Sequence, residues 1–150
     1  MKLAEALLLR AEHQEKIGLL QARILANLKV EQGDEPPEDP NALLREACEI
    51  NARLRELVKQ VNARNSVAML TDGRTLAEAL ADRDGLKKER DLLAAVACSA
   101  MERDYRLTHT ELKTRVTVSV AELQKRADTL SREYRELDAQ IQAANWTTEL

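Results

Sequence analysis

Aromatic side chains are scarce in this sequence and make up 2% of its 150 residues. Phenylalanine is missing, and the rings that are present belong to Tyr105, Tyr134 and Trp146. Large rings normally supply much of the volume of a thick globular core. Their scarcity therefore excludes a core of that kind and predicts thin layers of leucine, isoleucine, valine and alanine instead.

Histidine is also scarce, and its two copies limit the metal chemistry that the chain can offer. A carboxylate-bridged metal site in a helical bundle needs a glutamate three residues before each histidine. Here Arg10 precedes His13, and Arg106 precedes His109, at that spacing. The sequence therefore predicts no metal site of this type and places both histidines at the surface or at an interface.

Glycine and cysteine are few as well. The four glycines lie in neither a phosphate-binding loop nor a dinucleotide-binding motif, which disfavours nucleotide binding. A cysteine nucleophile needs a histidine base beside it, and neither Cys48 nor Cys98 has a histidine close in the sequence. We therefore predict a non-enzymatic protein with no catalytic residue and no cofactor.

Long apolar runs are missing too. The run Ala6–Leu9 near the N-terminus is far shorter than the roughly 20 residues that span a bilayer. Glu5 interrupts this apolar stretch and Arg10 follows it, which is unlike a signal peptide. The sequence thus predicts a cytoplasmic protein without a membrane segment, in which the two cysteines are reduced thiols.

Neither sign of charge dominates the sequence. Lysine and arginine number 23 against 26 aspartates and glutamates, for a net charge of -3. Nucleic-acid-binding proteins usually carry a basic surplus on one face, so nucleic acid is not an expected partner. Residues 32–40 carry four acidic residues and no basic one, which is typical of a solvated loop.

Charged residues are nevertheless abundant, at 33% of the chain, above the roughly 25% of ordinary globular proteins. Two segments combine them with apolar residues that recur at alternating steps of four and three, which is the heptad pattern of packed helices. The first seam consists of Leu43, Ala47, Ile50, Leu54, Leu57 and Val61. The second consists of Leu123, Ala127, Leu130, Tyr134, Leu137, Ile141 and Ala144.

Two looser apolar stripes predict further helices. The first is interrupted by Arg10 and His13, and Gly18 in its interior indicates a close helix crossing. Its members are Leu3, Leu7, Ile17, Leu20, Ile24 and Leu28. The other stripe consists of Leu76, Leu80, Leu86, Leu93 and Ala97.

Capping signals set the predicted helix starts. Asp39 can accept from the first backbone N–H groups of a helix, and Pro40 suits its first position. Thr75–Glu78 and Ser119–Glu122 are capping boxes. We predict an all-α fold, an elongated antiparallel bundle with coiled-coil-like seams that forms one domain over residues 1–150. Its helices lie at about 2–31, 40–65, 75–104 and 119–145.

Residues 113–118 are ambiguous. Val116 and Val118 alternate with polar residues at the strand period, but the same segment is compatible with a loop or with an early start of the last helix. An isolated strand leaves its backbone groups unpaired. Two copies of the segment can pair antiparallel across a two-fold axis, and on this ground we predict a homo-oligomer.

Three further residues are candidates for such an interface. Arg83 and Asp84 lie near the stripe that runs from Leu76 to Ala97, where they form an ion pair within or between chains or belong to an ordinary solvated helix face. Trp146 is a large ring near the end of the chain that needs cover, either from the bundle or from a second subunit. With Val116 and Val118, they form the predicted contact surface for a second copy or another protein.

Several motifs together resemble the bacterial septicolysin-like family, which comprises small helical proteins of unknown function. The most specific are Tyr134–Gln142 and Asn145–Leu150, and the others are Met1–Leu7, Glu31–Pro36, Asp72–Leu76 and Arg83-Asp84. The resemblance spans nearly the whole chain and implies no site residues. The family name implies a cytolysin as an alternative function. A third alternative is an enzyme with a site between subunits, built from Arg83, Asp84, Tyr105 and His109.

Overall fold

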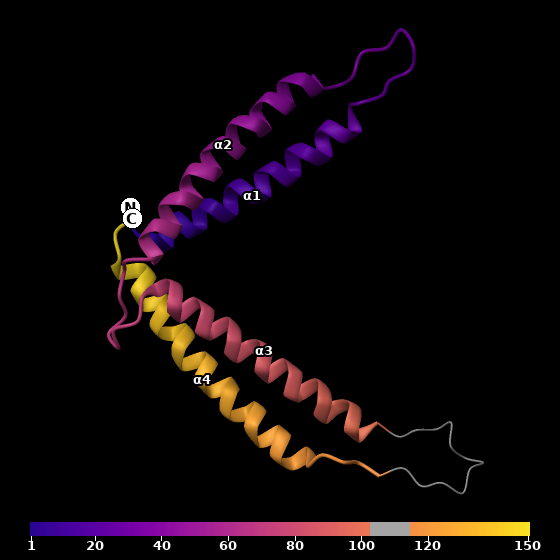
Figure 1. Cartoon of the computed structure of the whole chain (residues 1–150). Coiled ribbons are helices and arrows are strands. Elements are labelled where there is room, and N and C mark those ends of the chain that lie inside the picture. Colours follow the sequence, from indigo (N-terminus) through magenta and orange to yellow (C-terminus); the bar gives the residue numbers. More distant parts are fainter. Residues whose placement is uncertain (103–114) are drawn as a thin grey trace, which may run out of the picture. The chain divides into compact units, whose positions relative to one another are not determined.

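The computed structural model describes residues 1–102 and 115–150 (Figure 1). These residues form four helices, α1 (Leu3–Ala26), α2 (Pro40–Asn65), α3 (Leu76–Met101) and α4 (Val120–Thr147). The predicted all-α class is confirmed, and the described residues contain no extended strand. None of the helices in this part of the chain combines the length and the apolar character needed to cross a membrane.

The chain divides into two compact units. The first consists of Met1–Met69 and Gln142–Leu150, and it holds α1, α2 and the last turns of α4. The second, Leu70–Ile141, holds α3 and the remainder of α4. Each unit is built on an antiparallel helical hairpin.

In the first unit α1 and α2 lie side by side and run in opposite directions (Figure 1). Lys16 Nζ is 2.9 Å from Glu46 Oε1, and Arg23 pairs with Glu38 nearer the connecting loop. Residue numbers therefore rise along α1 as they fall along α2. The core between them is formed by Leu20, Leu43 and Ile50, with Ile17, Ile24 and Ala47 packed against it.

In the second unit α3 and α4 are also antiparallel (Figure 1). Arg83 Nη1 lies 3.1 Å from Asp138 Oδ1, and Arg126 Nη2 lies 3.1 Å from Glu89 Oε1. The later residue of α3 is thus joined to the earlier residue of α4. This hairpin is the counterpart of the first, with its seam drawn from the third and fourth predicted helices.

The two strict heptad seams are confirmed. Seven of their side chains are each at most 7% exposed, and burial of one such side chain contributes roughly 1.5–3 kcal/mol. They are Leu43, Ile50, Leu57 and Val61 on α2, and Leu130, Leu137 and Ile141 on α4.

The predicted caps also form. Asp39 Oδ1 accepts from the Asn41 N–H at 2.9 Å. At the start of α3 the Thr75 hydroxyl accepts from the Glu78 N–H at 3.2 Å, and the Glu78 carboxylate accepts in return from the Thr75 N–H at 2.8 Å. The predicted starts of α2 and α3 are therefore correct to within one residue, because local side chains fix them.

The first helix ends five residues before the predicted position 31. Asn27 follows its last turn and is 9% exposed. Its side-chain amide donates to the Arg23 carbonyl at 2.9 Å, and its oxygen accepts from the Glu38 N–H at 3.2 Å. Asn27 thus joins the end of α1 to the chain that enters α2 and stops the helix at Ala26. The third helix ends at Met101 rather than 104, and positions 103 and 104 lie outside the described residues.

The seam of α1 differs from the predicted stripe. Ala6 and Asn27 are buried, whereas Leu7 is only half-buried and Leu28 is 55% exposed. The buried face therefore steps along positions 3, 6, 10, 13, 17, 20, 24 and 27, all of them buried or half-buried. Gly18 lies off this face and marks no close crossing, since a Cβ built on it has no neighbour within 4 Å.

Residues 115–118, the described part of the predicted strand, form no strand. Val116 and Val118 lie in an irregular segment before α4 and are 55% and 43% exposed. Positions 113 and 114 lie outside the described residues. Ser119 caps the helix that follows this segment, and its hydroxyl accepts from the Glu122 N–H at 3.4 Å.

The two chain ends pair with each other in the first unit. The Leu3 N–H donates to the Thr148 carbonyl at 2.9 Å, and the Leu150 N–H donates to the Met1 carbonyl at 2.9 Å. The Lys2 ammonium adds an ion pair to Glu149 at 2.5 Å. These bonds satisfy backbone groups that chain ends usually leave to water.

Candidate functional site

Arg83 occupies a seam position of α3 and is 24% exposed. Besides its 3.1 Å bond to Asp138 of α4, its Nη2 lies 3.0 Å from Asp84 Oδ1. Burial acts to lower the pKa of the guanidinium, but the hydrogen bonds to Asp84 and Asp138 outweigh it and raise the pKa. Arg83 and Asp84 therefore contribute, through Asp138, to the packing of one hairpin.

Arg90 lies seven residues further along α3 and forms a second polar layer of the same seam. Its guanidinium carbon is 5.5 Å from the centre of the Tyr134 ring on α4, a cation–π geometry. Its Nη2 also lies 2.7 Å from Asp91 Oδ1. The two arginines near the α3 stripe, Arg83 and Arg90, thus contact α4 through Asp138 and Tyr134 respectively.

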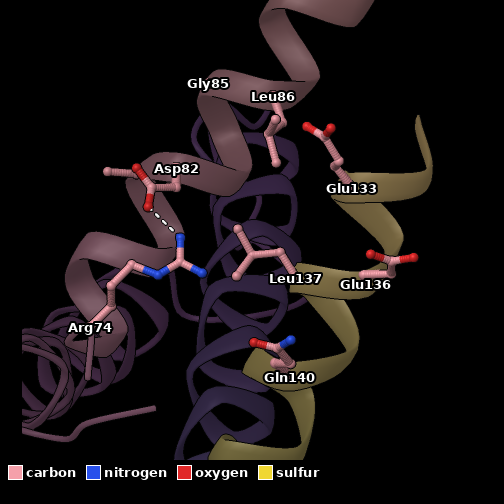
Figure 2. Close-up of a pocket in the computed structure, with 9 residues that line it drawn as sticks. Arg74, Asp82, Gly85, Leu86, Glu133, Glu136, Leu137 and Gln140 are labelled. Atoms are coloured by element: carbon pink, nitrogen blue, oxygen red, sulfur yellow. Dashed lines mark hydrogen bonds and ion pairs between the residues drawn. The ribbon is translucent and has the colours of Figure 1, made fainter. Parts of the chain in front are cut away.

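A groove of about 520 Å³ opens beside these layers, between α3 and α4 (Figure 2). Figure 2 shows Arg74 and Asp82 on one side of the groove, and Glu133, Glu136 and Gln140 on α4 at the other. Leu86 and Leu137 also line it. Its lining residues include no histidine, cysteine, serine or lysine, so the chemistry it offers is that of carboxylates around an apolar floor.

The basic group of the groove is already paired. Arg74 Nη1 lies 2.6 Å from Asp82 Oδ2, and its Nη2 lies 2.6 Å from Asp72 Oδ2. The hydrogen bond from Arg74 holds the pKa of Asp72 below its usual range, so this network is ionised at neutral pH. It fixes the turn that leads into α3, where Gly73 has a positive φ of 87°.

The predicted histidine and interface residues are dispersed. His13 lines a second groove, of about 580 Å³, with Leu9, Leu57 and Arg53 of the first unit. Among the described residues no group of three or more histidine, cysteine or acidic side chains has the geometry to hold a metal ion. Trp146 is 55% exposed near the end of α4. Tyr105 and His109 lie outside the described residues.

A further apolar feature, not among those predicted, is on α1, on the side opposite its buried seam. Leu8, Leu19 and Leu25 are 64%, 61% and 61% exposed. At 100° per residue they share an arc of roughly 120° with small residues, and Glu15 is the single polar member of that arc. We define the outer face of α1 as Leu8, Ala11, Glu15, Gly18, Leu19, Ala22 and Leu25, all of them exposed.

The outer face has its own heptad spacing. Leu8, Ala11, Glu15, Gly18, Ala22 and Leu25 follow one another at steps of three and four, the spacing of a helix-pairing seam. An apolar stripe this wide normally marks the side of a helix that packs on a neighbour. The buried seam of α1 already packs on α2, and among the residues that the structure describes the outer face is a second stripe that stays exposed.

Comparison with known proteins places this architecture in a family. Residues 10–150 match the model of a family of unknown function, DUF6847. The chain belongs to this family. A solved structure of a functionally unknown conserved protein from Corynebacterium diphtheriae is 41% identical to the chain, with a TM-score of 0.92. The match covers 100% of this chain and 98% of that one. No curated protein matches.

Neither DUF6847 nor the protein from Corynebacterium diphtheriae has a known activity, and neither bears the septicolysin name. The resemblance to the septicolysin-like family therefore rests on the sequence motifs alone. The sequence does contain a signal for the outer face of α1. It is a second set of residues at heptad spacing, distinct from the stripe that Arg10 and His13 interrupt.

Proposed function

We propose that this protein is non-enzymatic and works through protein–protein contact, beginning with association between copies of its own chain. The observation that carries the proposal is the outer face of α1. Its three leucines are more than 60% exposed although each lies on a well-formed helix. A contiguous exposed apolar patch is typical of an interaction surface.

Two further observations support a structural role. The arginines nearest the acidic groove are paired with aspartates of the same unit, which fits a role in holding the hairpin together. The free cysteines, Cys48 and Cys98, are both exposed, which fits the proposed cytoplasmic location, where thiols stay reduced.

Light scattering coupled to size exclusion tests the proposal directly. The chain has a mass of 16.9 kDa, and we expect the wild type to elute at a multiple of that mass. Leu8→Glu places a charge in the outer face and is expected to shift the protein toward the single-chain mass. Leu92→Glu is the matched control, since Leu92 is 63% exposed on α3, in the second unit, and is not a member of that face.

A wild type with the mass of one chain at all accessible concentrations would contradict the proposal. Loss of assembly in both variants, with circular dichroism unchanged, would show that added charge rather than the outer face is responsible. Release of reaction products from a library of small-molecule substrates by the purified protein would overturn the non-enzymatic part.

A further inference from the structure

We infer that two copies of this chain pair through the outer face of α1, antiparallel and across a two-fold axis between Glu15 and Gly18. The inference rests on the proposed function and makes it specific. It names the second copy as the occupant of the face and fixes the direction and register of the pair.

The first argument is the spacing of the face. In an antiparallel pair whose facing positions add to 33, Leu8 of one copy lies opposite Leu25 of its partner, and Ala11 lies opposite Ala22. Large residues then flank small ones on both sides of the axis. A two-fold interface presents the same patch on both copies. In this register the outer face meets that condition, because these leucines lie opposite leucines and these alanines opposite alanines.

The second argument concerns Glu15, the polar member of the face. A parallel pair would set Glu15 directly against its own copy, which is unfavourable because like charges repel. In the antiparallel register Glu15 lies opposite Gly18 of the partner. Because Gly18 has no side chain, it leaves room at this position of the contact for the glutamate side chain to turn toward water.

The third argument is charge along the edge of the face. Glu5 and Glu12 lie on this edge in the first half of α1, and Lys16 and Arg23 lie on it in the second half. Antiparallel pairing brings the same edge of both helices together, so the acidic half of one copy meets the basic half of the other. Lys16 and Arg23 are 53% and 51% exposed despite their contacts within the chain, and each is open to a second carboxylate. Complementary charge of this kind selects orientation more than it adds affinity.

Cysteine cross-linking in the full chain tests the register. In a Cys48→Ser, Cys98→Ser background, Leu8→Cys and Leu25→Cys proteins are prepared separately and as a co-expressed mixture, then mildly oxidised. The inference expects disulfide dimers between the Leu8→Cys and Leu25→Cys chains, and few in either variant alone. Cross-linking within each variant alone indicates a parallel pair and overturns the inference.

A matched glycine pair tests the face independently. Gly18→Leu and Gly85→Leu both place a side chain in open space on a helix, so both chains are expected to fold, as thermal melts monitored by circular dichroism will verify. Gly18→Leu is expected to raise the dissociation constant of the dimer at least about tenfold, because the added side chain fills the room that Glu15 of the second copy needs. Gly85→Leu is expected to leave it unchanged.

The outcomes separate this inference from the proposed function. A wild-type monomer in light scattering ends both. A wild-type dimer that is unaffected by Gly18→Leu, and that gives no cross-link in the mixture, keeps the proposed self-association and overturns the outer face of α1 as its site.

Discussion

Replacing Leu130 by alanine tests the packing of the second hairpin most directly. Leu130 is 2% exposed in the seam of α4. Leucine-to-alanine changes at such positions remove the transfer energy of the buried methyl groups and leave a cavity, at a cost of roughly 3–5 kcal/mol. Because leucine and alanine are both good helix formers, this cost reports tertiary packing rather than helix propensity.

For a chain of this length, such a loss lowers the melting temperature by roughly 2–4 °C per kcal/mol. We therefore expect Leu130→Ala to melt about 10 °C below the wild type by circular dichroism. Urea unfolding should show a reduced midpoint with an unchanged slope, as expected when stability changes and compactness does not.

Two matched leucines serve as controls. Leu92 is 63% exposed on α3 in the same unit, and Leu92→Ala is expected to change stability by no more than about 0.5 kcal/mol. Leu54 is half-buried on α2, and its alanine variant is expected to fall between the two. Equal losses for Leu92→Ala and Leu130→Ala would refute the seam. The same melt tests the predicted single domain, because units that unfold separately would give two transitions, with one moved by Leu130→Ala.

Three further predictions concern charge and membranes. A double-mutant cycle of Arg83→Ala and Asp138→Ala is expected to give a coupling of about 1 kcal/mol or less that shrinks in high salt, and a value above that range would show a more deeply buried pair. The hydrogen bond from Lys2 lowers the pKa of Glu149, so this contact stabilises above the ordinary carboxyl pKa and is lost as the pH falls through the lowered one. Glu149→Gln should therefore flatten the acid side of the stability profile, and an unchanged profile would contradict this. Purified protein should release no dye from liposomes, and dose-dependent release would favour the cytolysin alternative.

The sequence predicted most accurately those features that depend on neighbouring residues. Asp39 and Thr75 set their helix starts through bonds to groups two and three residues away, and those starts were placed correctly. The end of α1 was misplaced because Asn27 is held by Glu38, eleven residues further on. A hydrogen bond across a loop has no periodic signature, and the apolar Leu28 made the stripe look continuous.

The contacts of the candidate site residues could not be predicted for the same reason, because their partners are even further away in the sequence. Arg83 was noticed because an arginine near an apolar seam is unusual. Its partner Asp138 is 55 residues away, and nothing in the local pattern distinguishes that aspartate from others on α4. Val116 and Val118 were assigned a strand period, but a short run of alternating residues also occurs where a chain simply approaches a helix cap, as it does before Ser119.

A heptad pattern alone does not show whether an apolar stripe is buried within a hairpin or exposed, and α1 carries one stripe of each kind. A hairpin helix needs one apolar stripe to bury against its neighbour, and α2 and α4 carry their strict heptads on the buried side. Of the two stripes on α1, the exposed one, from Leu8 to Leu25, has the fewer polar members, whereas the buried stripe includes the polar Arg10, His13 and Asn27. Folding of the hairpin favours apolar residues in the buried stripe and gives no reason for a regular apolar stripe on the opposite side. The proposed pairing with a second copy supplies such a reason, because a two-fold contact needs the same apolar stripe on both chains.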